Sequence, residues 1–268
     1  MTKYDTACEV NMKELLSEAK YEARELLPFI NHNNSINDDL VFKEAAVDFM
    51  VSYKELRMRY VCAMKEIRTK FEVLSTEFGV RYERNPIANI STRLKRSASI
   101  VAKMKKLGLE PTLENMEKNI NDIAGVRVIC SYIDDIYLLA EALKAQKDIT
   151  LIAEKDYISN PKATGYRSLH LIVSVPVFFA DRMSDMTVEV QIRTIAMDFW
   201  ASLEHEIKYK KTVRDSEAIA ERLKKCAEVI AKTDEEMQNI RKELEFNSEP
   251  LTDTEILLNK IKNLDSPI

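Results

Sequence analysis

The sequence predicts an α+β protein in which a small mixed β-sheet is flanked by long helices. Three observations support this prediction. Residues 123–193 hold four short stretches with the composition or the alternation of β-strands. Long segments before and after them have the spacing of amphipathic helices. No internal repeat is present, so a repeat architecture is not expected.

The first part of the chain is predicted to be mainly helical. A short helix over 12–27 is followed by a polar link over 32–39. A long helix over 41–78 comes next and ends near Gly79. Its apolar residues recur at intervals of three and four, as on one face of a helix: Phe49, Met50, Tyr53, Leu56 and Tyr60.

Two shorter segments lead towards the sheet. Residues 91–107 are expected to form a loop that enters a helix. Residues 111–119 are expected to form a further short helix. Thr112 is a suitable N-cap for it, because a threonine hydroxyl can accept a hydrogen bond from a backbone N–H of the first turn.

Four strands are predicted, and the last has the clearest pattern. In TVEVQIR, residues 187–193, one face is apolar (Val188, Val190 and Ile192) and the other is polar (Thr187, Glu189, Gln191 and Arg193). The other strands are expected over 123–131, 150–156 and 168–175, with a helix over 133–145 between the first two.

Helices are predicted again after the strands. They cover residues 195–210 and 215–246, with a candidate terminal helix over 252–263. Phe199, Trp200 and Leu203 are expected in the core, because large apolar side chains are usually buried.

Composition excludes several classes of protein. The net charge of −4 over 268 residues argues against nucleic-acid binding through bulk charge. No run of 18 apolar residues is present, and the first ten residues, MTKYDTACEV, lack the apolar core of a signal peptide. The four cysteines are far apart, so we expect free thiols in a reducing cytoplasm rather than a zinc site.

Absent motifs narrow the chemistry further. The four glycines cannot build a GxxxxGK[ST] loop or a GxGxxG fingerprint. None of the three histidines precedes an aspartate, so a His-Asp metal hydrolase motif is missing. Phosphate binding by this chain would therefore have to use side chains rather than a glycine cradle.

The stretch STRLKRSASIVAKMKK, residues 91–106, is a candidate phosphate site. It holds six cations and no acid: Arg93, Lys95, Arg96, Lys103, Lys105 and Lys106. Ser97 and Ser99 add hydroxyls where a helix would start, and helix N-termini attract phosphate. A solvated basic helix face is an equally good interpretation of this stretch alone.

Two acids are candidate metal ligands. Asp122 precedes an apolar strand that Arg127 interrupts, and Glu189 lies on the polar face of TVEVQIR. Mg²⁺ prefers one or two carboxylates together with substrate phosphates, and Glu189 could instead accept the proton of a nucleophile. Taken separately, each of these three residues fits a plainer role better: Asp122 as a cap, Arg127 in a surface salt bridge and Glu189 on an exposed face.

The stretch KATGYRSLH, residues 162–170, combines a turn residue with an aromatic ring, two cationic side chains and a histidine. Gly165 permits a turn that a Cβ would hinder. Tyr166 can stack on a base, which is worth about 1–3 kcal/mol in nucleic-acid sites. Lys162, Arg167 and His170 can contact phosphates. The alternative is a hairpin turn with a packed tyrosine.

The order of these motifs resembles the RelA/SpoT synthetase domain. RLK, DIAGVRVIC, KATGYRSLH, EVQIRT and MDFWASLEH follow one another between residues 93 and 205. Together with the missing His-Asp pair, they make the chain similar to a small alarmone synthetase that stands alone without a hydrolase domain. The resemblance covers about residues 45–240, and MDFWASLEH looks more like the RelP-type branch than the RelQ-type branch.

The resemblance implies a nucleotidyltransferase-like mixed sheet and a cytoplasmic (p)ppGpp synthetase of the bacterial stringent response, which uses Mg²⁺. Such an enzyme transfers the β,γ-pyrophosphate of ATP to the 3′-hydroxyl of GDP or GTP and releases AMP. By position, Asp122 and Glu189 would be catalytic and bind the metal. ATP would contact Arg93, Lys95, Ser99, Lys103 and Arg127. The acceptor would contact Lys162, Tyr166, Arg167, His170 and Gln191.

The resemblance also implies a domain layout. Residues 1–40 would be a helical extension, 41–212 the synthetase core and 213–268 helices that contact other subunits of a homotetramer. The sequence departs from the family at Leu169, where a second aromatic is common, and at Asp198, where asparagine is common.

Two alternatives stay open at this point. A related nucleotidyltransferase would transfer a nucleoside monophosphate and release pyrophosphate, although its Gly-Ser entry motif is absent. An RNA-binding regulator would use the basic stretch and would need neither Asp122 nor Glu189.

Overall fold

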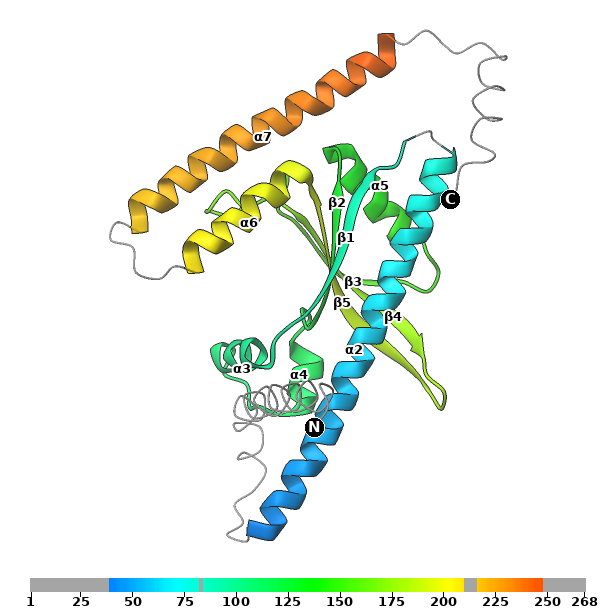
Figure 1. Cartoon of the computed structure of the whole chain (residues 1–268), viewed down its shortest axis with the longest axis vertical. Helices are drawn as coiled ribbons and strands as arrows, with labels where there is room; N and C mark the ends of the chain where they lie inside the picture. The colour runs from blue at the N-terminus through cyan, green and yellow to red at the C-terminus, as the bar shows by residue number, and fades with distance from the viewer. Residues whose placement is uncertain (1–38, 82–83, 210–215, 248–268) are drawn as a thin grey trace, which may run out of the picture. The chain divides into compact units, whose positions relative to one another are not determined.

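The computed structural model describes residues 39–81, 84–209 and 216–247. Within them lie five strands and six helices (Figure 1): α2 Asp39–Arg81, β1 Ile87–Leu94, α3 Ser97–Lys106, α4 Leu113–Asn119, β2 Ala124–Cys130, α5 Ile133–Lys144, β3 Thr150–Asp156, β4 Leu169–Phe178, β5 Met183–Thr194, α6 Ile195–Tyr209 and α7 Ser216–Asn247. The strands form one sheet in the order β1-β2-β5-β4-β3. The predicted α+β class is confirmed. The predicted helices over 12–27 and 252–263 lie outside the described residues.

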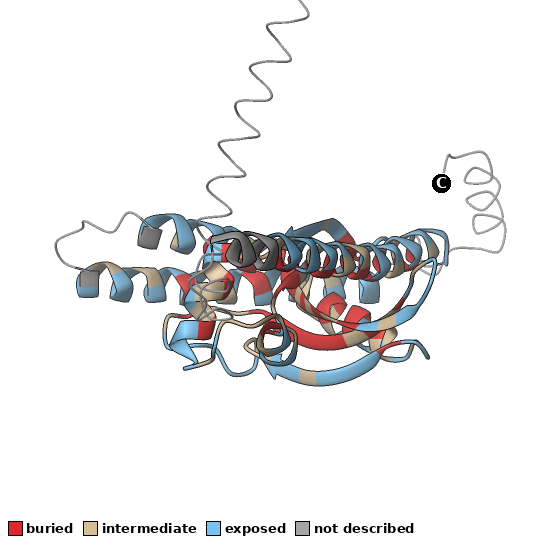
Figure 2. Ribbon diagram, turned by 90° about the horizontal axis from the view of Figure 1, so that it is seen from below, coloured by how far each residue is buried: buried red, intermediate tan, exposed pale blue. Residues whose placement is uncertain are grey.

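The described chain folds as two compact units. The first comprises residues 39–67, 92–126 and 172–189, and the second comprises the remaining described residues. Strands β1, β2, β4 and β5 contribute residues to both. Buried residues, coloured red in Figure 2, lie along the strands and on one side of the helices.

In the first unit, α2 carries a buried stripe that was predicted from the sequence. Tyr53, Leu56 and Tyr60 are at most 3% exposed, with Phe49 at 9%. Spacing of three and four places these residues on one face. The Tyr53 hydroxyl donates a hydrogen bond to Ser97 Oγ at 2.7 Å. The helix therefore holds the start of α3 in place.

The predicted cap of the short helix is also confirmed. Thr112 Oγ1 accepts a hydrogen bond from the backbone N–H of Asn115 at 3.1 Å. Helix α4 starts directly after it, at Leu113. This helix leads the chain towards Asp122 and β2.

In the second unit, α6 and α7 pack side by side (Figure 1). Trp200 of α6 is 5% exposed and donates its indole N–H to the backbone oxygen of Leu223 on α7 at 2.9 Å. The other half of α7 contacts the start of α5, where Gln238 Oε1 accepts a hydrogen bond from the Asp134 backbone N–H at 2.8 Å. Helix α7 is thus anchored near both ends.

Two predictions about elements and burial were wrong. Residues 87–94 form strand β1, where the sequence predicted the start of a loop over 91–107. Its side chains are mostly exposed, with only Ile87 buried, so the strand lacks an apolar pattern and is held by backbone pairing at the sheet edge. Phe199 and Leu203 are 60% and 43% exposed, so only Trp200 of the three expected core residues is buried.

None of the helices in the described part of the chain is long and apolar enough to cross a membrane.

Candidate functional site

A charged cluster surrounds Asp122 in the first unit. Lys95 Nζ lies 2.9 Å from Asp122 Oδ2, and Lys103 Nζ lies 2.8 Å from Asp122 Oδ1. Each oxygen of the carboxylate thus accepts a hydrogen bond from a different ammonium group. All three side chains keep access to solvent, since Asp122 is 24% exposed, Lys95 21% and Lys103 36%.

Backbone contacts of the surrounding elements bring the three side chains together. Lys95 follows β1, and its N–H donates to the backbone oxygen of Ile123 at 2.8 Å, next to Asp122. Arg57 of α2 donates to the Lys95 backbone oxygen at 3.2 Å. A Cβ at Gly125 would lie 3.3 Å from the backbone oxygen of Arg93, so a glycine there allows β1 and β2 to approach closely.

The electrostatics of the cluster favour an ionised carboxylate. Partial burial raises the pKa of Asp122, but the hydrogen bonds from Lys103 and Lys95 outweigh it and bring the pKa below its usual value. The two lysines in turn carry positive charge at a partly open surface. A phosphate group that arrived there would offer them new acceptors.

The other predicted residues of the first unit lie on the same elements. Arg93 is exposed on β1, and Ser99 is half-buried in the first turn of α3. Glu189 is half-buried on β5, which neighbours β2 in the sheet. The predicted alternation of TVEVQIR is confirmed, since Val188, Val190 and Ile192 are fully buried.

A divalent cation needs several oxygen ligands. No group of three or more His, Cys, Asp or Glu that could hold a metal occurs among the described residues. Mg²⁺ usually binds one or two protein carboxylates and takes its remaining ligands from water and substrate phosphates. The partly exposed Asp122 carboxylate suits such a site, with Glu189 as the predicted second ligand.

An aromatic cluster, formed by Tyr157, Tyr166 and His170, lies in the second unit. Its rings meet edge to face with centroids 5.3–6.1 Å apart. The Tyr166 hydroxyl lies 2.8 Å from His170 Nε2. Lys162 Nζ sits 4.4 Å from the centre of the Tyr157 ring and 4.7 Å from that of Tyr166, within the range of cation–π attraction.

His170 supports Tyr166 in this arrangement. The His170 side chain is buried, with 7% of its surface exposed, whereas Lys162 is exposed. The contact of His170 with a phosphate stays a prediction. Arg167 is half-buried and donates to the backbone oxygen of Gly165 at 3.3 Å. The loop that carries Tyr166 is thus fixed by its own neighbours.

Arg193 is buried at the centre of this site, although the sequence did not identify it. Its guanidinium donates to the Tyr166 hydroxyl at 2.6 Å and to Gln191 Oε1 at 2.8 Å. It lies 5.1 Å from the centre of the Tyr166 ring. Its place on the polar face of β5, two and four residues after Gln191 and Glu189, was a signal that could have found it.

Asp198 joins Arg193 to Arg127. Its Oδ1 lies 3.2 Å from Arg193 Nη1 and 3.3 Å from Arg127 Nη1. Arg127 therefore forms a salt bridge, as the plainer interpretation expected, while 37% of its side chain stays accessible. A chain of contacts runs from Arg127 through Asp198 and Arg193 to Tyr166.

Comparison with known proteins gives one consistent picture. The family described as "Region found in RelA / SpoT proteins" matches residues 92–214. GTP pyrophosphokinase YwaC of Bacillus subtilis is 45% identical over 175 residues, 65% of this chain and 83% of that protein. GTP pyrophosphokinase YjbM of the same species is 39% identical over 61% of this chain and 76% of that protein.

Solved structures agree with the sequence comparison. The small alarmone synthetase 1 of B. subtilis, bound to its product pppGpp, superposes with a TM-score of 0.67 at 35% identity. The match covers 72% of this chain and 98% of that one.

Proposed function

The chain belongs to the RelA/SpoT family, and we propose that it is a GTP pyrophosphokinase that synthesises (p)ppGpp. It transfers the β,γ-pyrophosphate of ATP to the 3′-hydroxyl of GDP or GTP and releases AMP. The similarity to two GTP pyrophosphokinases and to a synthetase bound to pppGpp supports this activity. The observation that carries it at the level of residues is the pair of lysines on Asp122.

The charged cluster is the proposed site of the donor phosphates. When ATP binds, Lys95 and Lys103 donate their hydrogen bonds to its phosphate oxygens instead of to Asp122. Ser99, at the start of α3, is an additional donor. Arg93 and Arg127 contact the adenine. Asp122 and Glu189 would hold Mg²⁺, which would supply positive charge to neutralise the phosphates.

The aromatic cluster is the proposed site of the acceptor. Tyr166 stacks on guanine, while Lys162 and Arg167 contact its phosphates and His170 and Gln191 complete the site. Arg193 keeps Tyr166 in one orientation through a 2.6 Å hydrogen bond. Fixed orientation matters because transfer depends on how the 3′-oxygen is placed in line with the bond that breaks.

The proposed reaction transfers the pyrophosphoryl group of ATP to the acceptor and removes one proton from the acceptor's 3′-hydroxyl. The 3′-oxygen of the acceptor attacks the β-phosphorus of ATP, and the bond from that phosphorus to the α,β-bridging oxygen breaks. Glu189 takes the proton of the 3′-hydroxyl. AMP leaves with the bridging oxygen, and Lys95 and Lys103 stabilise charge on the transferred group.

We also propose that the protein works in the cytoplasm as a homo-oligomer, a homotetramer by analogy with the family. Helix α6 supports an oligomer, because four apolar residues at intervals of four along it are exposed: Ile195 (57%), Phe199 (60%), Leu203 (43%) and Ile207 (40%). An exposed apolar stripe of this kind is typical of an interaction surface.

A product assay tests the function. The protein is incubated with Mg²⁺, γ-labelled ATP and either GDP or GTP, and the products are separated. We expect labelled ppGpp or pppGpp with an equal amount of AMP, and loss of both in Asp122→Ala and Glu189→Ala. Pyrophosphate in place of AMP would favour nucleoside monophosphate transfer. No product with either acceptor, together with unchanged RNA binding in both variants, would favour an RNA-binding regulator.

A further inference from the structure

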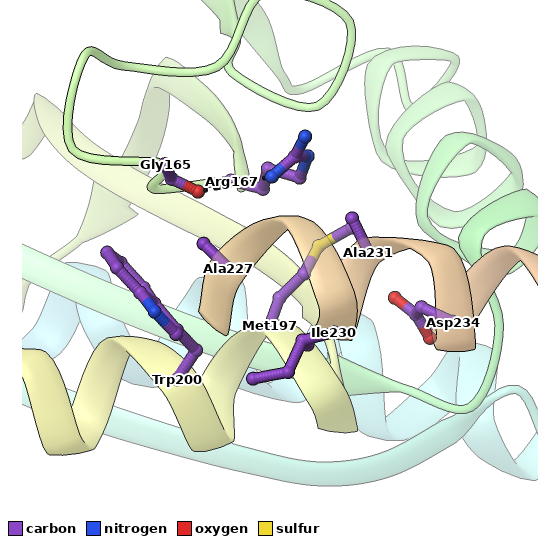
Figure 3. Close-up of a pocket in the computed structure, with 8 residues that line it drawn as sticks. All are labelled: Gly165, Arg167, Met197, Trp200, Ala227, Ile230, Ala231 and Asp234. Atoms are coloured by element: carbon purple, nitrogen blue, oxygen red, sulfur yellow. Dashed lines mark hydrogen bonds between the residues drawn. The ribbon is translucent and has the colours of Figure 1, made fainter. Parts of the chain in front are cut away.

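The loop that carries Tyr166 presses against α7. Gly165 has a φ of +88°, a backbone conformation that residues with a side chain rarely adopt. A Cβ built on it would lie only 2.6 Å from the Cβ of Ala227 and 3.6 Å from backbone atoms of Lys224. Figure 3 shows Gly165 facing Ala227 on α7. Residue 165 therefore has no room for a side chain.

Two backbone hydrogen bonds within the loop link Gly165 to Lys162 and Tyr166. The Gly165 N–H donates to the Lys162 backbone oxygen at 2.8 Å, and the Lys162 N–H donates to the Tyr166 backbone oxygen at 3.2 Å. These bonds close a tight turn. A displacement of Gly165 would therefore move the two residues on which the acceptor site depends.

Tyr166 also packs directly on the helices below it. Trp200 and Ala227 are buried in one small core, and Tyr166, Leu223 and Ile230 pack against that core. A pocket that is half open to solvent lies beside Gly165, Trp200 and Ala227, and its volume of about 10 Å³ has room for no more than one water molecule. A longer side chain at residue 227 that points toward Gly165 would therefore collide with the loop.

Helix α7 lies beyond residues 92–214, the region that matches the family. Its inward face repeats at helical spacing through Leu223, Ala227, Ile230 and Asp234. Building on the proposed function, we propose that α7 forms part of the acceptor site. Ala227 is then a positioning residue: it fixes Gly165, and through Gly165 the ring of Tyr166, and so sets the affinity for the guanine nucleotide.

Ala227→Leu tests this directly. The longer side chain overfills the contact and displaces the loop, so we expect the KM for GDP or GTP to rise about tenfold or more, with the KM for ATP changed less than about twofold. Ala218→Leu makes the same change at an exposed position of α7 and serves as the matched control.

A binding measurement without turnover gives a second readout. Trp200 is the only tryptophan of the chain and packs in the core that supports Tyr166. We expect GDP added to the wild-type protein to change its tryptophan fluorescence. In Ala227→Leu, the GDP concentration at the midpoint of this change should rise by a factor similar to that of the KM. Melting temperatures of all variants show whether the fold persists, and Ala227→Val replaces Ala227→Leu if the latter does not fold.

The outcomes separate this inference from the proposed function. An unchanged KM and midpoint for GDP in a folded Ala227→Leu or Ala227→Val protein would overturn the role of α7 while the synthetase activity stands. An equal rise in the KM for ATP and for the acceptor would also overturn it, because general loosening affects both. A wild-type protein that makes no product would overturn the proposed function, and this inference with it.

Discussion

The guanidinium of Arg193 lies 2.6 Å from the hydroxyl of Tyr166 and 5.1 Å from the centre of its ring. One buried cation thus holds the tyrosine both by a hydrogen bond and by attraction to the π-system. Tyrosine rings on protein surfaces usually sample several orientations. This one is fixed before any nucleotide binds, which lowers the entropic cost of stacking.

Arg193→Lys should weaken acceptor binding selectively. Lysine keeps the charge but cannot reach Tyr166, Gln191 and Asp198 together, because it lacks the planar fork of arginine. A lost hydrogen bond to a charged group costs about 1.5–3 kcal/mol, so we expect the KM for GDP or GTP to rise about ten- to a hundredfold. The KM for ATP, measured in the same assay, should change little.

Tyr166→Phe is the companion to that variant. It keeps the ring but removes the hydroxyl that contacts Arg193 and His170. We expect a smaller rise in the acceptor KM than for Tyr166→Ala. If Tyr166→Phe and Tyr166→Ala were equally impaired, the hydroxyl rather than the ring would carry the function.

The sequence predicted those features that depend on local pattern. The alternation of residues 187–193 placed Val188, Val190 and Ile192 in the core, and helical spacing placed Tyr53 and Leu56 there. Strand β1 was not predicted, because its exposed side chains lack alternation and its pairing with β2 is non-local. Phe199 was misplaced because periodicity does not tell which of two apolar faces is buried.

The site was predicted less completely than the fold. Asp122, Lys95 and Lys103 were identified, but their contacts join residues 27 and 19 positions apart, which local pattern cannot reveal. Arg193 was passed over because a charged residue on a strand is usually exposed. The contact of Gly165 with Ala227 depends on the packing of a loop against α7, for which no sequence motif exists.

Asp122 should make stability depend on pH in acid. Its pKa in the folded protein is below the unfolded value, so its contribution is present above the unfolded pKa and is lost as pH falls through the folded pKa. Between about pH 5 and about pH 2, the free energy of unfolding of the wild type should fall more steeply than that of Asp122→Asn. Urea unfolding at several pH values measures both.

The comparison with Asp122→Asn is decisive because asparagine does not titrate. Curves that stay parallel for the two proteins would show that the lysines do not stabilise the carboxylate. The same variant should also be inactive at neutral pH, since it removes a proposed metal ligand.

Asp234 should make the protein less stable as pH rises, which is opposite to the effect of Asp122. Burial raises its pKa despite the hydrogen bond from Thr194, so the folded protein binds this proton more tightly than the unfolded chain. The stabilising effect of the protonated form is present below the unfolded pKa and is lost as pH rises through the folded pKa. At neutral pH, Asp234→Asn should therefore unfold at a higher temperature than the wild type, and the difference should shrink in acid.

An exposed position supplies the control for that measurement. Asp185→Asn, on the open surface of β5, should shift the melting temperature little at either pH. A lower melting temperature for Asp234→Asn at neutral pH would mean that the ionised carboxylate stabilises α7 rather than straining it.

Phe199→Glu should dissociate the proposed oligomer. Phe199 lies in the middle of the exposed apolar stripe of α6, and a charge there would have to be desolvated on association. Sedimentation velocity should show a smaller species than the wild type at equal concentration. Val80→Glu places the same charge at a residue of α2 that is 72% exposed and should leave the mass unchanged. Equal masses for all three proteins would exclude the stripe as the subunit contact, since a buried glutamate at its centre could not be tolerated.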